Sequence, residues 1–142
     1  MAEYAAVPAA NIIPIADNVT YEQAACIEPI TVAIHGIERA RIMRSGKSAI
    51  VYGCGTIGLL TLQCLLAKGI ERIYIIDIDD AKLALAKKLG ACETLNSLKI
   101  DIPAYFAGHG KVDYAFETAG VNILQAQLPD LVKKRGSIVY IG

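Results

Sequence analysis

The chain has 142 residues, which is enough for one domain with a buried core, and 54% of its residues are hydrophobic. It has 14 basic and 14 acidic side chains, so its formal net charge is zero. This balance provides no strongly basic surface for nucleic acid. The densest basic cluster, Lys133-Lys134-Arg135, is interpreted as the solvated end of a helix.

The pattern of residues 2–16 indicates short extended pieces, because Pro8 and Pro14 interrupt them. Thr20 and Gln23 have the spacing of a capping box, which predicts a short helix that ends before Pro29. A longer helix is expected from residue 30 to about residue 43, because apolar side chains recur there at three- and four-residue spacing.

From residue 48 onward, predicted strands and helices alternate. The expected strands are 49–52, 73–77, 93–96, 112–117 and 137–141. The expected helices are 57–68, 80–89 and 122–128, with a kinked or second piece after Pro129 to about residue 134. Residues 98–111 are interpreted as a loop with room for one helical turn. The alternation predicts an α/β fold: a doubly wound parallel Rossmann sheet of about five strands, lacking the sixth, with helices on both faces.

The most informative motif is the G-x-G-x-x-G pattern formed by Gly53, Gly55 and Gly58. An apolar run precedes it, a helical segment follows it, and the next apolar run ends on Asp77, about 20 residues further on. This order and spacing are those of the dinucleotide-binding fingerprint. Gly53 permits a tight turn, and Gly55 lets a pyrophosphate approach the backbone. Gly58 lets the helix pack close to the sheet.

Thr56 and Ile57 begin the helix after the glycine turn, where free N–H groups and a partial positive charge favour phosphates. Two alternatives remain for this motif. One is a glycine-rich turn that binds no ligand. The other is an S-adenosylmethionine-dependent methyltransferase, which also places an acid at the end of its second strand.

The acids that end and follow the second strand indicate which dinucleotide would bind. Asp77 is expected to accept hydrogen bonds from the adenosine ribose hydroxyls. Asp77, Asp79 and Asp80 would together repel a 2′-phosphate, and no arginine follows the strand to receive one. Lys82 either reaches the ribose or extends into water. The sequence therefore predicts NAD rather than NADP.

The ends of the fourth and fifth strands are expected to complete the site. In open parallel sheets, ligands bind in the crevice outside the carboxyl ends of the strands. The nicotinamide half of the cofactor is therefore expected to lie against Thr118 and Ala119 after the fourth strand and against Ile141 at the end of the fifth.

Four cysteines, Cys26, Cys54, Cys64 and Cys92, occur in no zinc-finger spacing and are expected to be buried free thiols. Free thiols fit a reducing cytoplasm, and the first residues lack the features of a signal peptide. Residues 49–67 contain no charge and approach the length of a membrane span, but a strand, turn and helix explain their glycines. We therefore expect a cytoplasmic protein with no membrane partner.

The chain resembles the zinc-dependent medium-chain dehydrogenase/reductases and, within them, the polyol dehydrogenases. The resemblance covers essentially the whole chain but only the middle of the family's length. The segments that carry it are Ile27-Glu-Pro-Ile-Thr-Val32, Gly55-Thr-Ile-Gly-Leu-Leu60, Gln63-Cys64, Lys82-Leu-Ala-Leu-Ala-Lys87, Asn96-Ser97 and Glu117-Thr-Ala-Gly-Val121.

This resemblance implies hydride transfer from a polyol or polyol phosphate to NAD, with a catalytic zinc that polarises the substrate hydroxyl. It also implies that most zinc ligands, a Cys, a His and a Glu, belong to a separate N-terminal domain. Residues 1–20 are then the tail of that domain. Residues 21–142 are an NAD-binding Rossmann domain that is incomplete at its C-terminus.

Glu28 matches the family glutamate that reaches the catalytic zinc, although the residues alone suggest an acid held by local hydrogen bonds. His35 and His109 are interpreted as packing or surface residues, so no catalytic residue is identified in this chain. The isolated chain is expected to bind NAD weakly and to show no turnover, and the full-length protein is expected to be a homo-oligomer. A stand-alone NAD-binding or regulatory module is the alternative.

Overall fold

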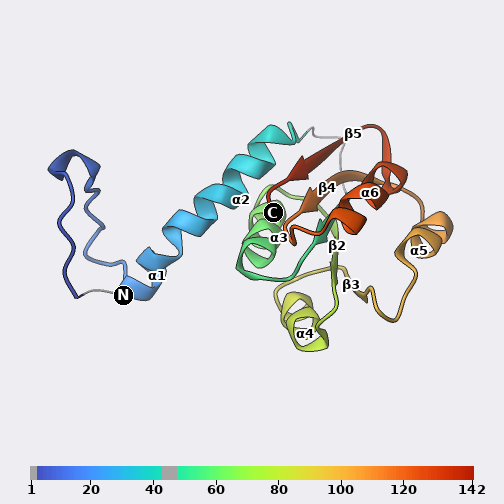
Figure 1. The fold of residues 1–142 in the computed structure, drawn as a ribbon, viewed down its shortest axis with the longest axis horizontal. Coiled ribbons are helices and arrows are strands. Elements are labelled where there is room, and N and C mark those ends of the chain that lie inside the picture. Colours follow the sequence, from blue (N-terminus) through green and yellow to red (C-terminus); the bar gives the residue numbers. More distant parts are fainter. Residues whose placement is uncertain (1–2, 43–47) are drawn as a thin grey trace.

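The computed structural model describes residues 3–42 and 48–142 (Figure 1). After a 3-10 turn at Ala9–Asn11, its elements are α1 (Tyr21–Ala25), α2 (Ile27–Arg39), β1 (Ser48–Tyr52), α3 (Thr56–Ala67), β2 (Arg72–Asp77), α4 (Asp80–Lys88), β3 (Glu93–Asn96), α5 (Ile102–His109), β4 (Val112–Glu117), α6 (Asn122–Leu131) and β5 (Val132–Tyr140). The strands form one sheet in the order β3-β2-β1-β4-β5, and every neighbouring pair is parallel. The predicted doubly wound parallel fold is therefore confirmed.

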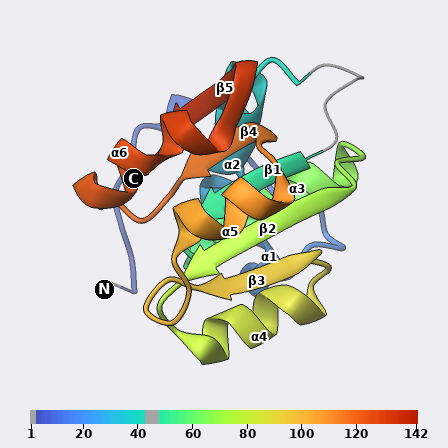
Figure 2. The ribbon, with the colours of Figure 1, turned by 90° about the vertical axis from the view of Figure 1, so that its right-hand side faces the viewer.

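Two apolar clusters, one on each face of the sheet, form the core. All five residues of β1 are buried, and their side chains alternate between the clusters. Ala49 and Val51 join the cluster that contains buried residues of α2, α3 and α4. Ile50 and Tyr52 join the cluster formed with α5 and α6, the helices that Figure 2 shows in front of the sheet. Burial on both faces explains the apolar residues of β1 and the apolar run 73–76 within β2.

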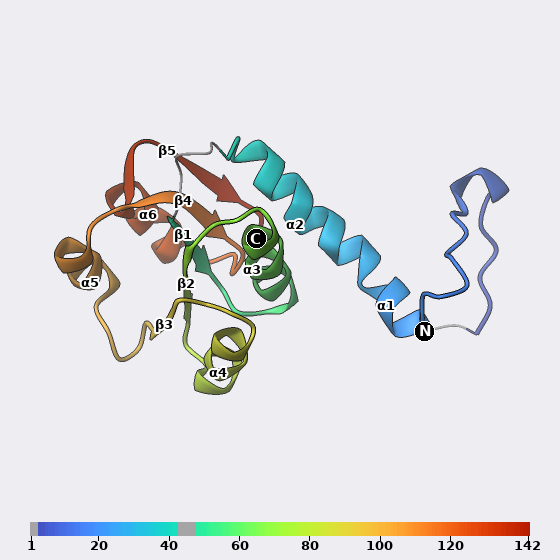
Figure 3. The same ribbon diagram turned by 180° about the vertical axis from the view of Figure 1, so that it is seen from behind.

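The N-terminal part, which comprises residues 3–20 and helix α1, projects away from the sheet, as Figures 1 and 3 show. The capping box is confirmed, since Gln23 N–H donates to Thr20 Oγ1 (3.2 Å) and Thr20 N–H donates to Gln23 Oε1 (3.0 Å). Pro29 lies in the first turn of α2, where a missing N–H costs no helical hydrogen bond. Helix α2 begins three residues earlier than predicted and ends at Arg39, before the predicted end near residue 43, which lies outside the described residues.

The prediction of a loop at residues 98–111 is wrong, because α5 occupies residues 102–109. Asp101 caps this helix by accepting a hydrogen bond from Ala104 N–H (3.0 Å). Pro103, which favoured a loop in the sequence, lies in the first turn, where proline is tolerated. Ile102 and Phe106 are buried against the sheet and provide the packing that stabilises the helix.

The predicted helix after Pro129 is also wrong in its extent. Helix α6 runs through Pro129 and ends at Leu131, and β5 begins at once, five residues before the predicted strand. The basic cluster therefore belongs to β5, in an irregular stretch where the pairing with β4 shifts register and Arg135 has a φ of 68°. Lys133 pairs there with Asp113 (2.8 Å).

The cysteines are free, but two of the four are not buried as expected. Cys54 is buried and Cys64 half-buried, whereas Cys26, between α1 and α2, and Cys92, before β3, are exposed because they lie outside the two core clusters. Burial is the main cause that raises the pKa of Cys54 to about 11, which keeps this thiol protonated. Within residues 3–42 and 48–142, no helix is long and apolar enough to cross a membrane.

Candidate functional site

Two glycines of the fingerprint are required by the fold itself. Gly53 has a φ of 95°, in the left-handed region that favours glycine, and its N–H donates to Ile76 O (2.8 Å) as the chain leaves β1. A Cβ on Gly58 would lie 2.0 Å from Gly53 O, so only glycine lets α3 approach the turn this closely. The geometry agrees with the tight turn predicted at Gly53 and with the close helix packing predicted at Gly58.

Gly55 is different, because nothing in the fold requires it to be glycine. Its φ of −80° is ordinary, and no described heavy atom lies within 4 Å of where its Cβ would stand. It is the N-cap of α3, yet no described side chain caps the helix, and Thr56 and Ile57 supply no acid to the first turn. The N–H groups of this turn have no partner within the helix. Gly55 therefore leaves open space in front of a helix N-terminus, an arrangement that suits a phosphate.

Asp77, the last residue of β2, holds the glycine turn in place. Its Oδ2 accepts a hydrogen bond from Cys54 N–H (2.6 Å), and its Oδ1 accepts from Ile78 N–H (2.7 Å) and Asp79 N–H (3.0 Å). Sequence reasoning missed this structural role. Since each carboxylate oxygen can accept two hydrogen bonds, Oδ2 keeps capacity for a ribose hydroxyl.

The acids after Asp77 have partners of their own. Asp79 caps α4 by accepting from Ala81 N–H (2.8 Å). Asp80 forms an exposed ion pair with Lys99 (2.6 Å) and accepts a hydrogen bond from Asn96 Nδ2 (2.8 Å). The hydrogen bond from Lys99 is the main cause that lowers the pKa of Asp80. Lys99 is a cation beside these acids that sequence reasoning missed, because it follows the third strand rather than the second.

A crevice of about 330 Å³ opens between the carboxyl ends of β1, β2 and β4, at the point where the strand order reverses. It brings together six of the predicted residues: Gly53, Gly55, Asp77, Lys82, Thr118 and Ala119. Thr56, Ile57 and Gly58 continue from its rim into α3. Ile141 does not line the crevice; it packs against α2, where its Cδ1 would lie 2.7 Å from a Cβ on Gly36.

The loop after β4 is joined to the glycine turn by Thr118. Its Oγ1 donates to Tyr52 O (2.7 Å) and lies 3.3 Å from Gly53 O, and its N–H also donates to Tyr52 O (2.9 Å). Glu117, one residue earlier, is fully buried, and its carboxylate binds the following residues of the loop. The sequence signal for Glu117 was an acid directly after the apolar run 114–116 at the end of a predicted strand.

Glu28 and both histidines lie apart from the crevice. Glu28 is exposed in the first turn of α2, and its main-chain O accepts a hydrogen bond from Thr31 Oγ1 (2.6 Å). Exposed His35 accepts from Arg39 Nε (3.2 Å), and exposed His109 stacks on Tyr105. Within residues 3–42 and 48–142, no three His, Cys, Asp or Glu side chains gather to hold a metal.

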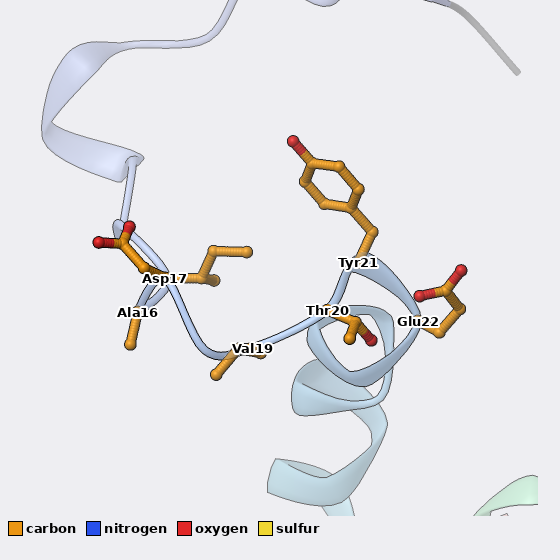
Figure 4. A pocket seen from close by; sticks show the side chains of 7 residues that line it. Ala16, Asp17, Val19, Thr20, Tyr21 and Glu22 are labelled. Atoms are coloured by element: carbon orange, nitrogen blue, oxygen red, sulfur yellow. The ribbon is translucent and has the colours of Figure 1, made fainter.

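One further hollow adjoins the crevice and shares Ile78, Ser97, Val121 and Leu124 with it, and others lie away from the glycine turn. The one in Figure 4 is an open depression on the N-terminal part, where Asp17, Thr20 and Tyr21 contribute to its lining. Its residues come from a single continuous segment and present no charged side chains that converge on a common point (Figure 4). The crevice at the switch point is therefore the candidate site.

The parallel sheet, its switch-point crevice and the glycine turn define a Rossmann domain of the NAD-binding type. The chain belongs to the zinc-binding dehydrogenase family, whose sequence profile matches residues 56–142. It is 42% identical over 102 residues to galactitol 1-phosphate 5-dehydrogenase of Escherichia coli strain K12, covering 72% of this chain and 29% of that protein. The resemblance to the polyol dehydrogenases is thus confirmed.

Solved structures of related enzymes have the same fold. An alcohol dehydrogenase of Escherichia coli CFT073, solved with NADH, superposes with a TM-score of 0.88 at 26% identity, over 94% of this chain and 40% of that one. A zinc-binding dehydrogenase of Sinorhizobium meliloti 1021, bound to NADP, gives 0.81 at 30% identity, over 90% and 39%. The chain thus spans about two fifths or less of the length of these relatives.

Proposed function

We propose that this chain is the NAD-binding part of a zinc-dependent dehydrogenase that transfers a hydride from a secondary alcohol of a polyol or polyol phosphate to NAD. The observation that supports this most strongly is Gly55. Packing and backbone conformation explain the other two glycines of the motif, whereas Gly55 leaves open space at the helix N-terminus, where a phosphate can approach the backbone.

In this proposal the pyrophosphate lies against Gly55 and the N–H groups of Thr56 and Ile57. Asp77 accepts hydrogen bonds from the adenosine ribose, with Lys82 at the edge of the same crevice. The nicotinamide half lies across the sheet against Thr118 and Ala119, with the main chain near Ile141 closing the end. The single crevice that joins these loops supports the arrangement.

The described residues do not by themselves form a zinc site. We propose that most zinc ligands belong to a separate N-terminal domain, of which residues 1–20 are the tail, and that Glu28 lies near the metal in the full-length protein. Several large apolar side chains of that segment, including Tyr4 (86% exposed) and Ile13 (87%), lie in solvent here, which supports further chain packed against them. We also propose a cytoplasmic homo-oligomer for the full-length protein.

We expect the chain to bind NAD at least about tenfold more tightly than NADP, because Asp77 would face the 2′-phosphate. One related structure was solved with NADH and another with NADP. The preference of this chain is therefore predicted from the charges beside its own crevice. Calorimetric titrations at matched ionic strength measure both dissociation constants, and equal affinities would refute the preference.

A substitution that frees Lys99 sharpens this test. Asp80→Asn removes the ion pair with Lys99 and is expected to raise NADP affinity by about fivefold with little change for NAD. Asp130→Asn, which removes an exposed acid from α6, is the matched control and should change neither affinity. An equal rise in NADP affinity in both variants would show that this affinity depends on the net charge of the chain and not on the release of Lys99.

We expect no polyol oxidation by the isolated chain with NAD and added zinc, because the described residues provide no complete metal site. Formation of NADH, followed by its absorbance, is the measurement. Galactitol 1-phosphate 5-dehydrogenase with its own substrate is the positive control. Turnover above the rate without protein would contradict the proposal that the catalytic zinc is bound mainly by another domain.

A further inference from the structure

Glu117 is a charged side chain with no exposed surface at the end of a central strand. Its Oε1 accepts hydrogen bonds from Ala119 N–H (2.8 Å) and Gly120 N–H (2.9 Å), and its Oε2 accepts from Gln125 Nε2 on α6 (3.1 Å). All three partners are N–H donors, so the carboxylate acts as an acceptor throughout. A buried carboxylate is costly unless it is hydrogen-bonded in this way, which indicates a specific role.

The main chain of the same residue holds the end of β5. Glu117 O accepts hydrogen bonds from Ile141 N–H (2.8 Å) and Gly142 N–H (3.1 Å). A Cβ on Gly142 would lie 2.5 Å from Gly120 N, so the two loops are in direct contact. Glu117 therefore joins the loop after β4 to the end of β5.

The side-chain contacts also fix the direction of two peptide groups. Residues 3–42 and 48–142 contain no cis peptide bond, so each N–H points opposite to the carbonyl of the preceding residue. Because the N–H groups of Ala119 and Gly120 point inward to the carboxylate, the carbonyls of Thr118 and Ala119 point away from the interior. Thr118 and Ala119, whose peptide groups are fixed in this way, line the crevice.

We propose that Glu117 is a positioning residue for the half of the dinucleotide that lies beyond β1, on the β4 side of the crevice. This inference rests on the proposed function. The glycine turn and Asp77 serve the adenosine half and have no direct hydrogen bond to the Glu117 carboxylate among the described residues. Loss of the carboxylate should therefore weaken binding of NAD but not of ADP, which lacks the nicotinamide half.

The test compares NAD and ADP binding by calorimetry in the full chain and in Glu117→Ala. We expect NAD affinity to fall at least about tenfold, because three donors lose their acceptor and the loop is released, while ADP affinity stays within about twofold. Glu117→Gln should recover most of the NAD affinity. Its Oε1 can still accept the two backbone N–H groups, and Gln125 can rotate to present its oxygen.

A matched control and a milder variant complete the experiment. Glu93→Gln alters a partly buried acid at the start of β3, the opposite end of the sheet, and should change neither affinity. Gln125→Ala keeps the carboxylate and its backbone partners, so it tests the proposal even if Glu117→Ala does not fold. We expect a selective loss of NAD affinity of about threefold.

Failure of the proposed function and failure of the role inferred for Glu117 would give different binding results. If the unchanged chain binds neither NAD nor ADP, the proposed function itself is wrong. If it binds both, but Glu117→Ala and Gln125→Ala weaken both ligands equally or weaken neither, Glu117 has only a structural role and the inference is overturned.

Discussion

Replacing Gly55 with aspartate is expected to abolish dinucleotide binding while leaving the free energy of unfolding unchanged or raised by about 0.5–1 kcal/mol. Gly55 is the N-cap of α3, has extended backbone angles and has open space where a Cβ would stand. Aspartate at this position would cap the helix and interact favourably with its dipole. The same carboxylate would occupy the N–H groups proposed for the pyrophosphate and repel it, so we expect at least about a hundredfold loss of NAD affinity.

Denaturant unfolding and NAD titration measure the two effects separately. Gly108→Asp is the matched control, because it places the same side chain in open space on α5, away from the crevice. We expect it to leave NAD affinity unchanged. Undiminished NAD binding by Gly55→Asp would show that the phosphate site is elsewhere.

Replacing Gly58 with alanine should have the second-largest effect, and on stability rather than on binding alone. The new Cβ would stand 2.0 Å from Gly53 O and 3.0 Å from Thr118 Oγ1. The closer of these atoms belongs to the backbone, so α3 must move away from the turn to relieve the contact. We expect a loss of about 3 kcal/mol in the free energy of unfolding, with NAD binding weakened because the turn is displaced.

Gly55→Ala is the natural comparison for this prediction. It adds the same methyl group three residues earlier, where no described atom would meet it, and should cost a few tenths to about 1 kcal/mol through poorer capping. Similar unfolding free energies for the two alanine variants would mean that the close approach of α3 to Gly53 is not required.

Much of the fold was predictable because its signals are local. The third and fourth strands were predicted with the observed bounds, because a glycine in a left-handed turn, Gly90 or Gly110, precedes each of them by two or three residues. Helix α5 was missed because its cap, Asp101, and its proline resemble loop signals until the burial of Phe106 is known. The early start of β5 depends on pairing with β4 through an irregular register, which no local pattern encodes.

In the site, too, the residues with local sequence signals were predictable, whereas contacts between distant segments were not. The glycine turn and Asp77 were readable because their spacing in the sequence is fixed by one strand, turn and helix. The contact of Asp77 with Cys54, the pairing of Asp80 with Lys99 and the packing of Ile141 on α2 join separate parts of the chain. Such contacts follow from the strand order and could not be read from spacing alone.

Calorimetric titration of the chain with NAD, and with S-adenosylmethionine under the same conditions, tests the central claim most directly. We expect NAD to bind with saturation at one molecule per chain, Gly55→Asp to remove this binding, and S-adenosylmethionine to produce no binding heat. Absence of NAD binding, or tighter binding of S-adenosylmethionine than of NAD, would contradict it.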